Sequence, residues 1–208
     1  MKIVLATRNR KKIEEIQRIV SGLAVTLLTL DDFPEFPEVV EDGETFQANA
    51  DKKAVAIAKQ TGLAALADDS GLVVDALGGA PGVHSARFAG PNASDADNLE
   101  RLLKDLDGVP DEKRTARFEC LLSLALGPDE VFHFSGTVEG RIGHTRRGEN
   151  GFGYDPVFFP LEAPEHTFAE MTAAQKDGMS HRGRALIGFA KALEEASSNS
   201  PLKIVLHP

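Results

Sequence analysis

The chain has little of what secreted, membrane-spanning or nucleic-acid-binding proteins depend on. It contains one cysteine, Cys120, so it cannot form an internal disulfide, and we expect a reducing compartment. No apolar run approaches the roughly 18 residues of a membrane span, and the apolar stretch 3–6 is too short for a signal peptide. A net charge of −9 argues against a nucleic-acid backbone as the main partner. We therefore expect a soluble, cytoplasmic protein that binds neither membrane nor nucleic acid.

The composition is otherwise that of an ordinary globular protein. The 208 residues are 42% hydrophobic and 26% charged, which excludes a disordered or fibrous chain. At about 150 residues per domain, this length fits one large domain or two closely joined lobes.

The hydrophobic pattern predicts an α/β protein with a mixed sheet. Short apolar runs indicate early strands at 2–6, 23–30 and 63–67. Alternation of apolar and polar residues from residue 115 indicates a long strand, and residues 131–142 are expected to form the strand or strands that return beside it. Apolar spacings of three and four predict the helices between them. The predicted helices begin near residues 10, 44, 95 and 180, the second ending at Gly62 and the third capped by Ser94 or Asp95.

Charge is distributed unevenly near the N-terminus. Residues 1–20 carry six basic and two acidic side chains, whereas residues 31–51 carry eight acidic side chains and no basic one. Either these segments are solvated faces, or they meet at a site where cations bind an anion and carboxylates hold a metal. The second arrangement would suit a nucleotide.

A basic turn follows the first predicted strand. It consists of Thr7, Arg8, Asn9, Arg10, Lys11 and Lys12. Between a strand and a helix, backbone N–H groups and the helix dipole favour an anion. The turn lacks the glycine pattern of a P-loop, so two interpretations stay open: a phosphate site or an exposed basic turn.

Paired carboxylates follow the third predicted strand. Asp68 and Asp69 are expected where that strand ends. Either the pair binds Mg²⁺ and one of the two activates a water, or the pair forms an Asx turn that only ends the strand. Glu41 and Asp42 precede a predicted helix. Either they cap that helix, or one of them completes the shell of a metal held by Asp69.

Two later segments combine aromatic and titratable residues. The glycine-rich loop 151–156 contains Phe152 and Tyr154, which either stack on a planar ligand or plug the core. Ser180 opens the last helix as a possible cap, and His181 and Arg182 follow it. Arg182 offers five N–H donors to a keto oxygen or a phosphate.

Five motifs in order resemble those of the inosine/xanthosine triphosphate pyrophosphatase family. They are Thr7-x-Asn9-x-x-Lys12, Ala67-Asp68-Asp69-Ser70-Gly71-Leu72, Leu77 to Phe88, Gly151-Phe152-Gly153-Tyr154-Asp155-Pro156, and Ser180-His181-Arg182. The resemblance runs from residue 2 to about residue 195. It implies one domain over 1–195 and a C-terminal extension over 196–208.

The resemblance implies an elongated mixed β-sheet with flanking helices, in which two lobes enclose a nucleotide-binding cleft. Members of the family are usually homodimers. They hydrolyse purine nucleoside triphosphates such as ITP, dITP and XTP to the monophosphate and pyrophosphate with Mg²⁺, which removes non-standard purines from the nucleotide pool.

By similarity, each motif also implies a role. Asp69 would be the acid–base residue, and Glu41 and Asp69 the metal ligands. The substrate-binding positions would be Thr7, Arg8, Asn9, Arg10, Lys11, Lys12, Ser70, Phe152, Gly153, Tyr154, Asp155, Lys176, His181 and Arg182. Two alternatives are a septum-associated nucleotide pyrophosphatase with another base specificity and a nucleotide-binding module without turnover; the presence of both Asp68 and Asp69 argues against the second.

Overall fold

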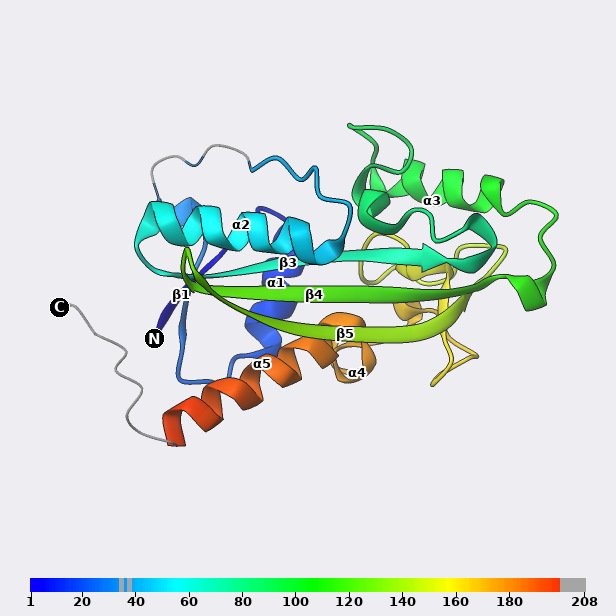
Figure 1. The fold of residues 1–208 in the computed structure, drawn as a ribbon. Helices are drawn as coiled ribbons and strands as arrows, with labels where there is room; N and C mark the ends of the chain where they lie inside the picture. Colours follow the sequence, from blue (N-terminus) through cyan, green and yellow to red (C-terminus); the bar gives the residue numbers. More distant parts are fainter. Residues whose placement is uncertain (34–35, 37–38, 199–208) are drawn as a thin grey trace.

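The computed structural model describes residues 1–33, 36 and 39–198 and contains one six-stranded mixed sheet (Figure 1). The strand order is β2-β1-β3-β4-β5-β6. The strands are β1 (Lys2–Leu5), β2 (Thr26–Leu28), β3 (Ala64–Val74), β4 (Thr115–Gly127), β5 (Glu130–Ile142) and β6 (Phe158–Pro160). Most of the predicted extension 196–208 lies outside the described residues.

Among the described residues, five α-helices flank the sheet, with α2 over one face and α5 over the other (Figure 1). They are α1 (Arg10–Ile19), α2 (Phe46–Thr61), α3 (Asp95–Asp105), α4 (Ala173–Met179) and α5 (His181–Ser198). Across the described residues, no helix combines the length and apolarity that crossing a membrane requires.

The helix ends follow from local chemistry that the sequence carries. Asn9 caps α1 by accepting hydrogen bonds from the backbone N–H groups of two following residues. Gly62 ends α2 in the left-handed region at φ 68°, and Ser94 forms a capping box with Asp97 at the start of α3. The predictions for Gly62 and Ser94 are confirmed.

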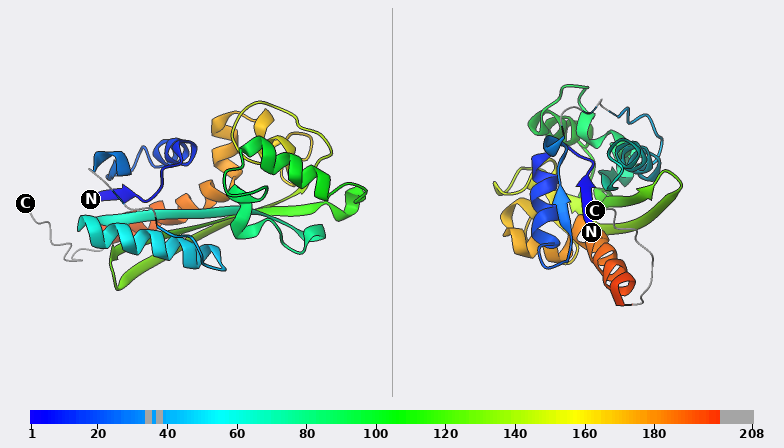
Figure 2. Two further views of the ribbon diagram at one scale, coloured as in Figure 1. Left: turned by 90° about the horizontal axis from the view of Figure 1, so that it is seen from above. Right: turned by 90° about the vertical axis from the view of Figure 1, so that its left-hand side faces the viewer.

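The long strands join two ends of the molecule. β1 pairs in parallel with β2 and with the first residues of β3, whereas β3, β4 and β5 are antiparallel to one another. Figure 2 shows β1 and α1 beside one end of these strands and α3 beside the other end. The predicted mixed sheet is therefore confirmed, with its parallel part confined to one end.

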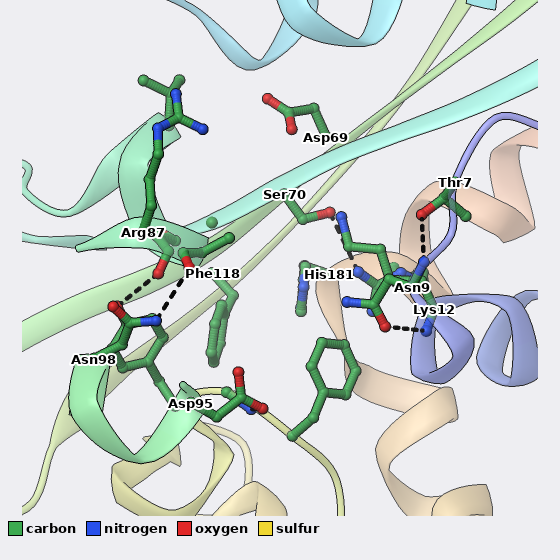
Figure 3. Close-up of a pocket in the computed structure, with 18 of the residues that line it drawn as sticks. Thr7, Asn9, Lys12, Asp69, Ser70, Arg87, Asp95, Asn98, Phe118 and His181 are labelled. Carbon is green, nitrogen blue, oxygen red and sulfur yellow. Dashed lines mark hydrogen bonds between the residues drawn. The ribbon is translucent and has the colours of Figure 1, made fainter. Parts of the chain in front are cut away.

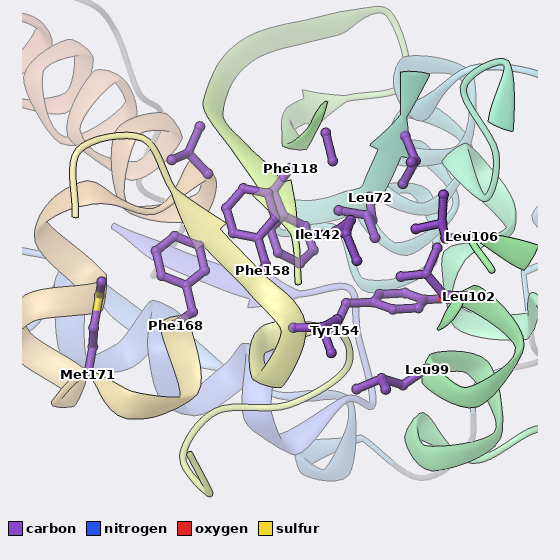
Figure 4. Close-up of a cluster of buried hydrophobic side chains, with 14 residues drawn as sticks. Leu72, Leu99, Leu102, Leu106, Phe118, Ile142, Tyr154, Phe158, Phe168 and Met171 are labelled. Carbon is purple, nitrogen blue, oxygen red and sulfur yellow. The ribbon is translucent and has the colours of Figure 1, made fainter. Parts of the chain in front are cut away.

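Each end has its own buried core. At the β1 end, α2 packs on one face of the sheet and α1 with α5 on the other. At the far end, a third cluster joins Leu72, Leu102 and Phe118 of three elements with Tyr154 of the glycine-rich loop (Figure 4). A cleft lies between these cores.

The structure corrects two strand predictions. The predicted strand 23–30 is reduced to Thr26–Leu28, because Leu30–Asp32 forms a short 3₁₀ turn. Asp68 and Asp69 do not follow a strand end: β3 continues through both to Val74, paired throughout with β4. The alternative that an Asx turn ends the strand at Asp68 and Asp69 is therefore wrong. α4 and β6 were not predicted from the sequence.

Candidate active site

The cleft runs along the part of β3 that β1 leaves unpaired. The pairing of β1 with β3 ends at Leu5 opposite Leu66, whereas β3 continues for eight more residues, to Val74. The resulting cavity of about 330 Å³ is lined by residues of both ends of the molecule (Figure 3). The exposed edge of β3 thus lets side chains from both faces of the sheet reach one ligand.

Asp69 lies on the α2 side of this edge. Its carboxylate accepts hydrogen bonds from Lys53 Nζ at 3.2 Å and Asn49 Nδ2 at 3.3 Å. The same ammonium donates to Glu41 Oε2 at 2.9 Å, so the two carboxylates converge on one cation. Burial raises the pKa of Asp69 and nearby Glu41 adds to this, while Lys53 opposes both.

Asp68 points to the opposite face, because successive side chains of a strand alternate. Its carboxylate is fully buried and lies 2.5 Å from Lys12 Nζ and 2.7 Å from Arg182 Nε. Burial opposes its charge, but Arg182 and Lys12 hold the pKa of Asp68 well below its usual range. The adjacent carboxylates therefore have different environments.

The basic turn lies between β1 and α1, as predicted. Thr7, Arg8, Asn9 and Lys12 line the cleft. Asn9 Oδ1 accepts from the backbone N–H groups of Lys11 at 3.0 Å and Lys12 at 3.2 Å, so these two donors are engaged. Arg10 does not line the cleft, and Lys11 lines a neighbouring cavity of about 360 Å³.

The far wall is built by the glycine-rich loop and the two last helices. Lys176 Nζ, buried, donates to Asp155 Oδ2 at 2.6 Å and Glu15 Oε1 at 2.8 Å, and it lies 5.0 Å from the centre of the Phe152 ring. Despite burial, Asp155 and Glu15 raise the pKa of Lys176. Arg182 also contacts Glu15 and lies 5.7 Å from the Phe152 ring.

His181 stacks on Phe118, with ring centres 4.7 Å apart and planes 10° apart. Burial, and then the charges of Arg182 and Lys176, place the pKa of His181 well below its ordinary range, so the ring is neutral. Among the described residues, nothing hydrogen-bonds its buried Nδ1. Ser180 Oγ accepts from the Gly183 backbone N–H at 3.0 Å, which supports its predicted role as a cap.

The structure brings all the predicted site residues except Arg10 and Lys11 to this one cleft. The others lining it are Thr7, Arg8, Asn9, Lys12, Glu41, Asp69, Ser70, Phe152, Gly153, Tyr154, Asp155, Lys176, His181 and Arg182. The alternative that Glu41 or Asp42 caps α2 is wrong, because Thr45 accepts from the backbone N–H of Ala48. Asp42 instead pairs with Lys52 on the surface.

Sequence reasoning missed two cations of the cleft, Lys53 and Arg87. Lys53 lies on the same face of α2 as Ala50, Ala54 and Ile57, and a lysine among these apolar positions was the available signal. Arg87 belongs to the motif 77–88 and donates to the Glu41 carbonyl at 3.0 Å. Lys53 thus contacts the carboxylates of Asp69 and Glu41, whereas Arg87 holds the main chain at Glu41.

Cations, carboxylates and an aromatic ring lining one cleft are typical of a nucleotide-binding site. The chain belongs to the Ham1 family, whose model matches residues 3–192. Together with the relatives described next, which bear the name dITP/XTP pyrophosphatase, this match confirms the predicted family membership.

Relatives match nearly the whole chain. A Geobacter sulfurreducens protein named dITP/XTP pyrophosphatase is 55% identical over 185 residues, which cover 89% of this chain and 92% of that protein. The structure of a HAM1 protein from Coxiella burnetii matches with a TM-score of 0.86 and 41% identity, covering 94% of this chain and all of that one.

A second structure, the nucleoside-triphosphatase / dITP/XTP pyrophosphatase of Mycobacterium abscessus, matches with a TM-score of 0.75 and 46% identity, over 91% of this chain and 98% of that one. The predicted α/β fold with a mixed sheet and flanking helices is confirmed.

Proposed function

We propose that this chain hydrolyses the non-standard purine triphosphates ITP, dITP and XTP to the monophosphate and pyrophosphate. Its relatives bear the name dITP/XTP pyrophosphatase at 44–55% identity. The observation that carries the proposal is the position of Asp69, a carboxylate with a raised pKa beside Lys53 and opposite the basic turn.

In this proposal Asp69 accepts a proton from the attacking water. A general base must lie within hydrogen-bond reach of the water that it activates, and Asp69 lines the cleft together with the basic turn. Lys12 and Lys53 offset the negative charge that develops on the leaving pyrophosphate. Thr7 and Asn9 hold phosphate oxygens, and an incoming phosphate replaces Asn9 Oδ1 as partner of the Lys11 and Lys12 backbone N–H groups.

Glu41 and Asp69 would hold Mg²⁺. Their oxygens lie 2.9 and 3.2 Å from the single Nζ atom of Lys53, so they already converge on one positive charge. Mg²⁺ commonly takes one or two protein carboxylates and completes its shell with waters and substrate phosphates, a requirement that these two residues meet. When bound, the ion supplies charge stabilisation to the phosphates.

The far wall would recognise the base. Phe152 offers a ring for stacking, and Lys176 uses two of its three N–H groups on Asp155 and Glu15, which leaves one for a ligand. A donor aimed at the 6-oxo group meets the amino group of adenine donor to donor, at a cost of about 1–3 kcal/mol for each unpaired group. Ser70, Gly153, Tyr154 and Arg8 complete this proposed substrate-binding surface.

The proposal includes a homodimer, as the resemblance implies, and a cytoplasmic location, in keeping with the single cysteine. Light scattering coupled to size exclusion tests the dimer directly, with a mass of twice 22.3 kDa expected.

The experiment that tests the function is pyrophosphate release measured across ITP, XTP, dITP, ATP, GTP and dTTP with Mg²⁺. We expect the first three to react fastest. Preference for dTTP would favour the septum-associated alternative, and nucleotide binding without any turnover would favour the non-catalytic module.

A further inference from the structure

Asp68 lies beneath the cleft, and its side chain has no solvent exposure. It accepts hydrogen bonds from side chains of four elements. The donors are Lys12 of α1, Ser70 of β3, Cys120 of β4 and Arg182 of α5. No other carboxylate described in the structure accepts hydrogen bonds from both Lys12 and Arg182.

Both oxygens of Asp68 are occupied. Oδ1 lies 2.5 Å from Lys12 Nζ, 2.7 Å from Ser70 Oγ and 3.4 Å from Arg182 Nη2. Oδ2 lies 2.7 Å from Arg182 Nε and 3.4 Å from Cys120 Sγ. A carboxylate offers about four lone-pair sites, so these donors leave no room for a metal ion or a reacting water.

We infer that Asp68 is a positioning residue, which fixes Lys12 and Arg182 relative to each other so that one substrate can contact both. The inference rests on the proposed function, in which Lys12 offsets the charge of the phosphates and the far wall recognises the base; Arg182 belongs to that wall, 5.7 Å from the Phe152 ring. Asp68 therefore does not share the role of Asp69, although the two are adjacent.

The strand geometry explains how two adjacent carboxylates take different tasks. Leu66 packs with α1 and α5, whereas Ala65 and Ala67 pack with α2. By the two-residue period of a strand, Asp68 shares the face of Leu66, and Asp69 shares the face of Ala67. Asp69 has two longer contacts, at 3.2 and 3.3 Å, and lines the cavity, so it is accessible to a ligand.

The two cations depend on Asp68 to different degrees. In the described part of the chain, Asp68 is the residue that Lys12 Nζ hydrogen-bonds, through its carboxylate and, at 3.5 Å, its carbonyl oxygen. Arg182 has a second carboxylate, Glu15. Loss of the Asp68 charge therefore frees the flexible Lys12 stem more than it frees Arg182.

The test measures binding to the two ends of the substrate site separately by titration calorimetry, with tripolyphosphate and with IMP as the probes. We expect Asp68→Asn to weaken tripolyphosphate at least about fivefold and IMP by a smaller factor. Lys12→Met should weaken only tripolyphosphate, and Arg182→Lys only IMP. Wild-type protein that binds neither probe would refute the proposed function itself.

A double-mutant cycle separates positioning from a general structural effect. If Asp68 acts through Lys12, then adding Asp68→Asn to Lys12→Met should weaken tripolyphosphate no further. Additive losses would overturn the inference. So would an Asp68→Asn protein with unchanged affinity for both probes, or one whose only change is a higher Mg²⁺ requirement for turnover.

Two further variants control for folding. Asp51→Asn removes another carboxylate, one that accepts a hydrogen bond from the buried Ser123 and lies outside the cleft. We therefore expect this variant to have a lower Tm but unchanged affinity for both probes. If Asp68→Asn does not fold, Asp68→Glu keeps the charge and displaces the carboxylate by one methylene. Positioning predicts weaker tripolyphosphate binding in that variant too, and wild-type affinity would contradict it.

Discussion

Lys53 is the cation that holds the two proposed metal ligands together, and its removal gives the most quantitative prediction. Its ammonium donates to Glu41, to Asp69 and to the carbonyl of Asp68, and its side chain is only 10% exposed. Lys53→Met keeps most of the aliphatic stem and removes the charge. Asp69 and Glu41 then face each other with no cation between them.

The cost follows from the burial of each partner. Breaking a buried ion pair costs about 3–5 kcal/mol. The side chain of Glu41 is 36% exposed, so solvent screens its interaction with Lys53. We therefore expect the free energy of unfolding to fall by about 3 kcal/mol, the lower end of that range. In a domain of this size that corresponds to a Tm lower by about 6–12 °C in the absence of divalent metal.

Mg²⁺ should restore much of this loss. A ligand at 100 times its Kd stabilises the folded state by about 2.7 kcal/mol. Because Lys53 no longer competes for the same oxygens, the Tm of the variant should rise more with Mg²⁺ than that of the wild type. Scanning calorimetry with EDTA and with Mg²⁺ measures both quantities.

The neighbouring lysine provides a matched control. Lys52 is 48% exposed and pairs with the exposed Asp42, so Lys52→Met should change stability by less than about 0.5 kcal/mol and leave the Mg²⁺ response unaltered. A Lys53→Met protein that melts at the wild-type Tm, or whose Tm gains nothing extra from Mg²⁺, would contradict this role of Lys53.

Three other predictions follow from buried contacts. Burial raises the pKa of Glu15, but Arg182 and Lys176 outweigh burial and hold the pKa below its ordinary value of 4.5. The Glu15 charge therefore stabilises the fold above pH 4.5, and this stabilisation is lost as the pH falls through the folded-state pKa. Glu15→Gln should therefore cost about 1–3 kcal/mol at pH 7 in urea melts, with the difference from wild type narrowing in acid. Gly136→Ala places a Cβ 2.1 Å from a carbonyl oxygen of α5 and should destabilise by about 1–3 kcal/mol, whereas Gly127→Ala, with open space around it, should not; melts of both variants check this. Arg182→Ala should raise the KM for ITP and reduce the ratio of kcat/KM for ITP to that for ATP in steady-state assays. An unchanged ratio with a lower kcat would instead place Arg182 at the phosphates.

The parts of the fold that the sequence predicted are those governed by local pattern. Alternation along Thr115–Gly127 predicted β4, and the caps at Ser94 and Gly62 predicted where two helices begin and end. The seven-residue α4 escaped detection because it is too short to display a period and contains a glycine.

The error at Asp68 has a nonlocal cause. Hydrophobicity alone ends a strand at its first charge, yet β3 buries this carboxylate because Lys12 and Arg182 neutralise it from positions 56 and 114 residues away. No local pattern reports such pairing. The motifs nevertheless named most residues of the cleft, since they follow strands and loops that meet at the free edge of β3.

The most direct test of the account is the rate at which Asp69→Asn forms pyrophosphate from ITP at saturating Mg²⁺. The substitution keeps the size of the side chain but removes its ability to accept a proton. We predict IMP and pyrophosphate as the wild-type products and a fall in kcat of about 10²–10⁴-fold in the variant, with its fold preserved in thermal melts. Asp75→Asn, at a 55% exposed carboxylate outside the cleft, should retain wild-type kcat. A well-folded Asp69→Asn protein with full activity would contradict the account.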